Sequence, residues 1–169
     1  MKNLKNSGGV ISSIAAIKEN DIEKLVKIES HDSSKTNGSS IAFILEYENK
    51  KILFLSDAHE NIVYDQLCDL KNNGYELAFD LVKISHHGSN ANISVRLLDL
   101  IDSSKYLIST NGKKYSHPSK ETIAKIIIKK TNYTKEIILN YELNDIISIF
   151  EPYQKDYNFR IYSKNVINI

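Results

Sequence analysis

Short blocks of apolar residues alternate with polar segments along the chain, and each block predicts one strand or one helix. Two β-rich runs, residues 41–47 and 51–55, predict a hairpin that turns at residues 48–50. Later runs of the same kind predict strands at residues 81–84, 106–109, 136–141, 146–150 and 159–162. The helical spacing of apolar residues predicts helices over residues 21–30, 61–71, 93–101 and 117–130. Pro118 is expected in the first turn of the last helix. This alternation indicates an α/β (α+β) fold, a mixed sheet covered by helices.

Polar segments divide the chain into a lead-in and one main region. Ser7-Gly8-Gly9 predicts a flexible start, which a short helix follows. Residues 31–40 contain mostly Asp, Ser, Thr, Asn and Gly, a composition typical of a loop. We therefore expect a lead-in with a short helix over residues 1–36 and one folded unit over residues 37–169.

Composition narrows the classes of function that suit the chain. Its 169 residues suffice for one domain with a real core, and 41% hydrophobic residues is ordinary for a globular protein. A formal net charge of +1 gives no support for a broad basic face that captures nucleic acid. The single cysteine, Cys68, excludes an internal disulfide and a cysteine-rich zinc cluster. Because no apolar run is long enough to span a membrane and the N-terminal residues make a weak signal peptide, we expect a cytoplasmic protein.

Three groups of polar residues follow directly after predicted strands. They are Asp57 with His59, His86 with His87, and the segment from Asn111 to His117. Strand ends in α/β folds hold functional side chains on a rigid scaffold while the chain turns away. Carboxylate oxygen together with imidazole nitrogen suits zinc, manganese or iron better than calcium. Asp57 also has the chemistry to bridge two metal ions.

Each of these residues also has a purely structural interpretation. Asp57 has the position of a helix N-cap, and His86-His87-Gly88 suits a tight turn with one solvated imidazole. His117 suits a helix-entry residue that bonds to the backbone. His59 suits an exposed position in the first turn of a helix, and His31 suits a solvated loop. Residue type and position alone leave these alternatives open.

Four short motifs follow one another along about half of the chain. They are Asn37-Gly38-Ser39-Ser40, Leu55-Ser56-Asp57-Ala58, Val82-Lys83-Ile84-Ser85-His86-His87-Gly88-Ser89, and Asn111-Gly112-Lys113-Lys114-Tyr115-Ser116-His117-Pro118. Their order resembles the C-terminal part of metallo-β-lactamase-fold hydrolases, in the branch related to the DNA-uptake protein ComEC. That branch has Asn-x-x-Ser, then Gly-Asp-Ala, then His-His-Gly-Ser, and finally Asn, an aromatic residue and His-Pro.

The resemblance implies a fold and a chemistry. The fold is half of an αββα sandwich, in which two such halves bury their sheets against each other between outer helices. Asp57 resembles the metal-bridging carboxylate and His87 the late histidine ligand, with Zn²⁺ or Mn²⁺ as the metal. The resemblance also implies catalytic contacts from His86 and His117, and substrate contacts from Ser89 and Asn111. In that family a metal-bound water attacks a phosphodiester or another ester-like bond, so the expected substrate is a phosphoester or a nucleic acid.

The chain departs from the family pattern at three points. Ser56 replaces the usual Gly before the aspartate, a change that is tolerable if φ there is below zero. His59 stands where the branch often has an acidic residue. The defining His-x-His-x-Asp-His motif occurs nowhere in residues 1–169. Zinc catalysis normally needs about three protein ligands per metal, so we expect this chain alone to bind metal weakly.

Three hypotheses from different classes remain. The favoured one is the C-terminal half of a metal-dependent hydrolase, phosphodiesterase-like or nuclease-like, which is incomplete as a catalyst alone. Its completion would come from a complementary N-terminal half or from self-association. The second hypothesis is a non-catalytic binding or interaction domain that keeps the half-fold. The third is an enzyme with an unrecognised site such as Ser85 with His86, but neighbouring residues of a strand point to opposite faces, which disfavours a nucleophile–base pair.

A half-sandwich also predicts an uncovered sheet face. Phe43 and Leu45 should point to one face of the sheet, and Ala42 and Ile44 to the other. Both faces therefore carry apolar residues, and an exposed apolar surface of this kind normally marks a contact. We expect a partner, a second copy or residues 10–30 to cover it.

Overall fold

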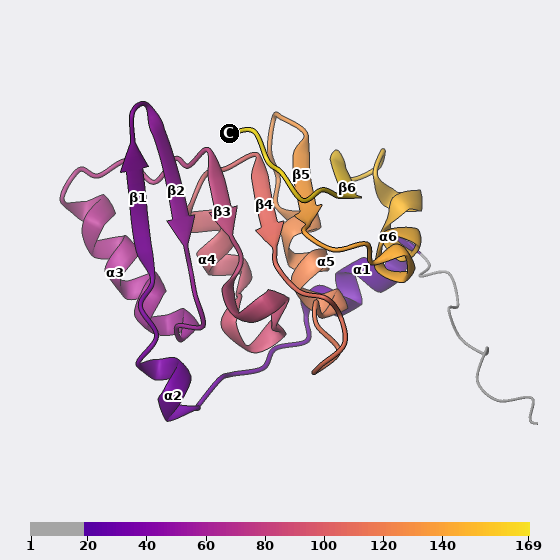
Figure 1. The fold of residues 1–169 in the computed structure, drawn as a ribbon, viewed down its shortest axis with the longest axis horizontal. Helices are drawn as coiled ribbons and strands as arrows, with labels where there is room; N and C mark the ends of the chain where they lie inside the picture. The colour runs from indigo at the N-terminus through magenta and orange to yellow at the C-terminus, as the bar shows by residue number, and fades with distance from the viewer. Residues whose placement is uncertain (1–18) are drawn as a thin grey trace, which may run out of the picture.

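A six-stranded mixed sheet organises residues 19–169, the part of the chain that this computed structural model describes (Figure 1). The strands lie side by side in chain order: β1 (Phe43–Tyr47), β2 (Lys50–Phe54), β3 (Leu81–Lys83), β4 (Lys105–Ile108), β5 (Lys135–Leu139) and β6 (Phe159–Ser163). β1 and β2 form an antiparallel hairpin, and every later strand runs parallel to its neighbours. This arrangement confirms the α/β class. The predicted flexible start at residues 7–9 lies outside the described residues.

The described helices are α1 (Glu19–Val26), α2 (Lys35–Gly38), α3 (Glu60–Asn72), α4 (Val95–Leu100), α5 (Lys120–Ile128) and α6 (Asn144–Phe150). α1, α3, α4 and α5 lie behind the sheet in the view of Figure 1, whereas α2 lies below the β1–β2 hairpin and α6 beside β6. Three short 3₁₀ segments are η1 (Ser85–Gly88), η2 (Asn90–Asn92) and η3 (Glu151–Tyr153). α1 packs on α5, and its Ile22 is fully buried in the core. The N-terminal helix therefore belongs to the helix layer.

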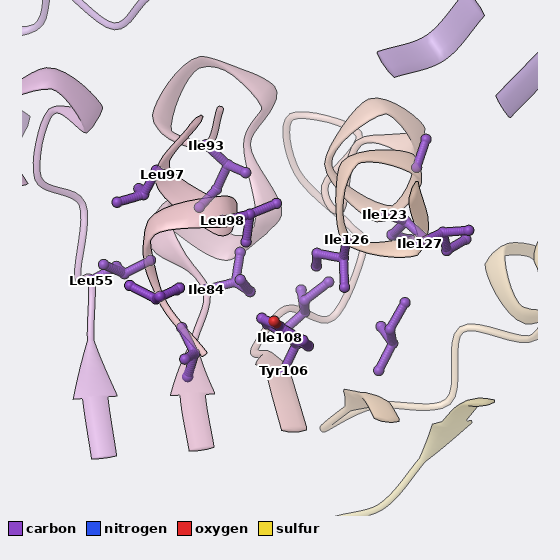
Figure 2. Close-up of a cluster of buried hydrophobic side chains, with 14 of the residues drawn as sticks. Leu55, Ile84, Ile93, Leu97, Leu98, Tyr106, Ile108, Ile123, Ile126 and Ile127 are labelled. Atoms are coloured by element: carbon purple, nitrogen blue, oxygen red, sulfur yellow. The ribbon is translucent and has the colours of Figure 1, made fainter. Parts of the chain in front are cut away.

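The core lies between the sheet and these helices. Leu55, Ile84, Tyr106 and Ile108 come from the sheet side and face aliphatic side chains of the helices (Figure 2). The helix side contributes Leu97, Leu98, Ile123, Ile126 and Ile127. Each fully buried aliphatic side chain stabilises the fold by about 1.5–3 kcal/mol relative to exposure. This layer fixes the strands whose ends carry the candidate site.

None of the helices described within residues 19–169 covers the opposite face of β1 and β2. Phe43, Leu45 and Tyr47 are 46%, 44% and 69% exposed. Phe43 stacks on Phe54 of the neighbouring strand, with ring centroids 4.7 Å apart. Ala42 and Ile44 instead pack against the core cluster. The predicted split of this strand between two apolar faces is confirmed. Of the predicted cover at residues 10–30, α1 does not reach the exposed face because it packs on α5, and residues 10–18 lie outside the described residues.

The C-terminal segment lies over another part of this face. The Lys164 N–H donates to the Leu139 carbonyl at the end of β5. The Asn168 carbonyl accepts a hydrogen bond from Lys105 Nζ at the start of β4, 3.0 Å away. Residues 164–169 therefore run back along β4 and β5, and the exposed apolar surface narrows to β1 and β2.

Three element predictions are wrong. The predicted loop at residues 31–40 contains one helical turn, α2, which begins after the N-cap Ser34. Residues 146–150 form most of α6 rather than a strand. Ile146, Ile149 and Phe150 recur at helical spacing, and Ile149 and Phe150 are buried on one side of the helix. Pro118 precedes α5 instead of occupying its first turn, because Ser119 is the N-cap and accepts a hydrogen bond from the Thr122 N–H.

Candidate functional site

The sequence-predicted site residues follow strands whose carboxyl ends share one edge of the sheet. β2, β3 and β4 are parallel, so the loops after them emerge side by side. Asp57 follows β2, His86 and His87 follow β3, and Asn111 follows β4. His117 lies later in the β4–α5 loop, and its ring centroid is 5.5 Å from that of His86. The rings of His86 and His87 are 6.2 Å apart.

Left-handed backbone conformations shape the loops at this edge. His86 has φ 41° and ψ 52°, and His87 has φ 57° and ψ 20°. Ser56, directly before Asp57, has a φ of 48°. The condition on which the Gly-to-Ser change was expected to be tolerable is therefore not met, and Ser56 carries backbone strain. Strained residues of this kind concentrate at functional sites.

Hydrogen bonds join the loop after β2 to the loop after β3. The His86 N–H and the Ser85 hydroxyl both donate to the Ser56 carbonyl, at 2.8 and 2.9 Å. Ser85 is buried, and its hydroxyl is oriented toward a backbone carbonyl rather than an imidazole. This geometry is unfavourable for the Ser85–His86 nucleophile hypothesis.

His87 is exposed, and within residues 19–169 only one of its ring nitrogens makes a hydrogen bond. Its Nδ1 lies within hydrogen-bonding distance of the Ser109 carbonyl, which accepts only, so Nδ1 must carry the proton. The lone pair is then on Nε2. Histidines that bind metals commonly have this arrangement, in which the other nitrogen donates to a carbonyl or a carboxylate.

His117 differs from the two histidines of the turn. It is half-buried, and its Nδ1 atom is buried without a hydrogen-bond partner among the described residues. Burial, and then the nearby His86 and His87 rings, lower the pKa of His117 from its ordinary value. A neutral ring avoids a buried, unpaired N–H at Nδ1 if the proton is on Nε2. His117 is therefore suited to donate a hydrogen bond through Nε2.

Asp57 uses its backbone, rather than its carboxylate, to hold its loop. Its N–H donates to Ser40 Oγ at 3.2 Å, and its carbonyl lies 3.3 Å from Asn92 Nδ2. Burial lowers the pKa of Lys83, and the Asp57 carboxylate raises it, so the two side chains are near enough to interact electrostatically. The helix-cap interpretation of Asp57 is wrong, since His59 is the N-cap residue of α3.

The two predicted substrate contacts lie in neighbouring pockets. Ser89 is buried, and its hydroxyl accepts from the Ala91 N–H. It lines a cavity of about 890 Å³ that His117 also borders. Asn111 is exposed and lines a second cavity, of about 440 Å³, together with His87 and His117. The cavity at Asn111 thus contains more of the candidate residues.

Some residues of this region received no role from the sequence or were missed. Lys113, Lys114 and Tyr115 belong to the fourth motif but were given no role there, and they line the cavity of Asn111. Tyr141, which lines the same cavity, was missed because no motif contains it. Asp32 lies in the predicted loop at residues 31–40 and reaches His86. Burial alone would raise the pKa of Asp32, but hydrogen bonds from Asn37, Asn92 and the Ser34 N–H outweigh it and lower the pKa to about 2.

His31 and His59 were both expected to be exposed residues outside the site, and the structure agrees only for His31. His31 is exposed, as expected for a solvated loop residue. His59 is not an exposed residue of the first helical turn, because its side chain is only 18% exposed. Its Nε2 donates to the Ser34 carbonyl at 2.9 Å. His59 therefore ties the 31–40 loop to the start of α3.

Asp57 and His87 have suitable donor types for zinc or manganese, but they are too few for a complete site. Within residues 19–169, no group of three or more His, Cys, Asp or Glu side chains is arranged to hold a metal ion. None of the helices in that range is long and apolar enough to cross a membrane. Comparisons with protein-family models, curated proteins and solved structures gave no match. The family resemblance therefore stays a prediction that rests on the four motifs.

Proposed function

We propose that this chain is the C-terminal half of a metal-dependent phosphoesterase of the metallo-β-lactamase type. The observation that carries the proposal is the grouping of three imidazoles at the strand-end edge. His87 has a free Nε2 lone pair for a metal, and His117 is suited to donate through Nε2. Asp57, at the neighbouring strand end, would supply the carboxylate ligand. A bound metal would supply an activated water for attack on a phosphoester.

The roles of the chain's own residues follow from their surroundings. Neutral His117 would donate a hydrogen bond to a phosphoryl oxygen, because its lowered pKa disfavours the imidazolium form. Lys113 and Lys114 line the same cavity and would attract the negative charge of a phosphoester. Asn111 would contact substrate at the cavity wall, since its side chain is exposed there.

We propose further that a complementary N-terminal half covers the exposed apolar face of β1 and β2. Two features on this side of the sheet support a partner of this kind. The uncovered residues Phe43, Leu45 and Tyr47 need an apolar partner, and the edge at Asp57 and His87 needs further metal ligands. A second copy of the chain would meet the first need but would bring only the same ligand set. This favours a polypeptide of different sequence that carries histidine and aspartate ligands.

A metal titration tests the proposal. Calorimetric titration of Zn²⁺ or Mn²⁺ into the metal-free chain should show weak binding, because only about two ligands are present. Asp57→Ala and His87→Ala should each abolish that binding, whereas His31→Ala, at an exposed position in a different pocket, should leave it unchanged. A nanomolar site that survives both substitutions would contradict the assigned ligands. No binding by the unaltered chain would favour a non-catalytic interaction domain.

A further inference from the structure

The carboxylate of the half-buried residue Asp32 lies near the histidine turn and has no part in the chemistry proposed above. The Asp32 side chain is 9% exposed. Its Oδ1 accepts from the Ser34 N–H at 2.8 Å, and its Oδ2 accepts from Asn37 Nδ2 at 2.7 Å. Asn92 Nδ2 donates to the same Oδ2 at 3.0 Å. Because three donors surround it, the group is held as an ionised acceptor.

Asn92 has only one orientation that satisfies its neighbours. Its Nδ2 faces Asp32 Oδ2 and the carbonyl oxygens of Asp57 and Ala58, at 3.0, 3.3 and 3.2 Å. All three neighbours accept, so the amide NH₂ must be on that side. The Asn92 Oδ1 atom must then face the other side, where His86 Nδ1 lies 3.0 Å away. Asn92 is buried, which makes an unsatisfied amide costly.

The orientation of Asn92 determines which nitrogen of His86 carries the proton. An amide oxygen accepts only, so His86 Nδ1 must donate to it. Asn37 Nδ2 lies 3.4 Å from the same Nδ1 and would need Nδ1 as an acceptor, but that contact is longer. The Asp32 carboxylate, 3.7 Å from Nδ1, also attracts a proton there. These groups together favour the Nδ1–H tautomer.

We propose that Asp32 is a positioning residue that acts through Asn92 to hold His86 in the Nδ1–H tautomer, with the lone pair on Nε2. Neutral imidazole in water prefers the opposite tautomer, so the protein must impose this one. His86 and His87 then both have Nε2 lone pairs, while His117 has an Nε2–H donor. The tautomer itself does not depend on the proposed function. Only the identity of the group that the His86 Nε2 lone pair would contact, a metal or a substrate, rests on that function.

Nitrogen NMR of the unaltered chain is the first test. Long-range proton–nitrogen correlation spectra of histidine-labelled protein distinguish a protonated ring nitrogen from one with a lone pair. The spectra are recorded at alkaline pH, where imidazoles are neutral, and His86→Gln assigns the signals. We expect His86 to show a protonated Nδ1 and a lone pair on Nε2. An Nε2–H pattern for His86 would overturn the proposal.

Asp32→Asn tests whether Asp32 imposes the tautomer. The substitution keeps the shape of the side chain but replaces one carboxylate oxygen by an NH₂ donor. Asn92 then loses the charged one of the three acceptors that fix its orientation, and His86 Nδ1 loses the nearby negative charge. We expect the His86 signals to shift toward the Nε2–H form. Asp80→Asn is the matched control, because Asp80 accepts from the Lys51 N–H at 2.9 Å and from Lys50 Nζ at 3.1 Å, at the opposite end of β2.

A second variant keeps the test decisive if Asp32→Asn does not fold. Asn92→Ser removes the amide bridge and should give the same shift of the His86 signals. An unchanged Nδ1–H pattern in either folded variant would overturn the role of Asp32. The measurement contains no metal and no substrate, so a failure of the proposed hydrolase function would leave its result unaffected.

Discussion

Ser56 adopts a backbone conformation that suits glycine, and this strain lies directly before the candidate ligand Asp57. A non-glycine residue in the left-handed region costs about 1–2 kcal/mol. Glycine removes that cost but loses about 0.5–1 kcal/mol more chain entropy on folding. We therefore expect Ser56→Gly to raise the free energy of unfolding by up to about 1.5 kcal/mol in urea denaturation. Ser39→Gly, at a φ of −93°, should lower it or leave it unchanged. A destabilised Ser56→Gly protein would show that the serine side chain has an unrecognised contact.

The residues of the candidate site differ in how far the sequence could predict them. Asp57, His86 and His87 follow apolar runs, so their place at strand ends was predictable from the hydrophobic pattern. The role of Asp32 was not predictable, because it depends on a contact with Asn92, sixty residues away, and Asp32 lies in a segment without a periodic pattern. The positive φ at Ser56 had one signal in the sequence, the glycine that the resembled family usually has at this position, because glycine is the default residue for positive φ.

At the scale of elements, prediction succeeded where the period of the pattern was clear. The β1–β2 hairpin, the strand leading to the histidine turn and α3 all lie within a few residues of their predicted bounds. The failure at α6 has a physical reason. Its composition is rich in isoleucine, which favours strands. In addition, the helix is too short for its helical period to stand out in the sequence. Packing of Ile149 and Phe150 into the core overrides the local preference.

Lys135 connects β5 to the end of α5. Its side chain should make the free energy of unfolding depend on pH in the alkaline range. Its buried ammonium donates to the Ile127 and Lys129 carbonyls. Burial, and then the charge of Lys129, lower the pKa of Lys135 from 10.5 to about 8. Between these values the unfolded chain binds more protons, so the free energy of unfolding should rise with pH.

The difference between the unaltered chain and Lys135→Met isolates this contribution. From pH 7 to pH 10 the free energy of unfolding of the unaltered chain should rise relative to that variant by about 2 kcal/mol. Denaturant unfolding at a series of pH values measures it. Lys130→Met, at an exposed position, should follow the unaltered chain. Parallel curves for the chain and Lys135→Met would mean that Lys135 keeps an ordinary pKa.

At the scale of the whole molecule, the two sheet faces differ in what covers them. One face carries the helix layer and the core, and residues 164–169 lie over β4 and β5 on the other. Among the described residues, the apolar surface on β1 and β2 stays exposed, and β2 also leads to Asp57 at the edge of the candidate site. The proposed complementary half would cover this surface and reach that edge from the same side.

Leu45→Lys tests whether that surface is a contact. The residue is 44% exposed on the uncovered face, so a charge there should leave the fold intact and make association unfavourable. Without a complementary half, the unaltered chain should self-associate as its concentration rises, and Leu45→Lys should shift it to monomer in light scattering after size exclusion. Ile62→Lys is the matched control, since Ile62 is 49% exposed on α3, in the helix layer, and should not change the mass. A monomeric unaltered chain at all concentrations, with the same mass for both variants, would mean that β1 and β2 need no cover and would remove the main support for a complementary half.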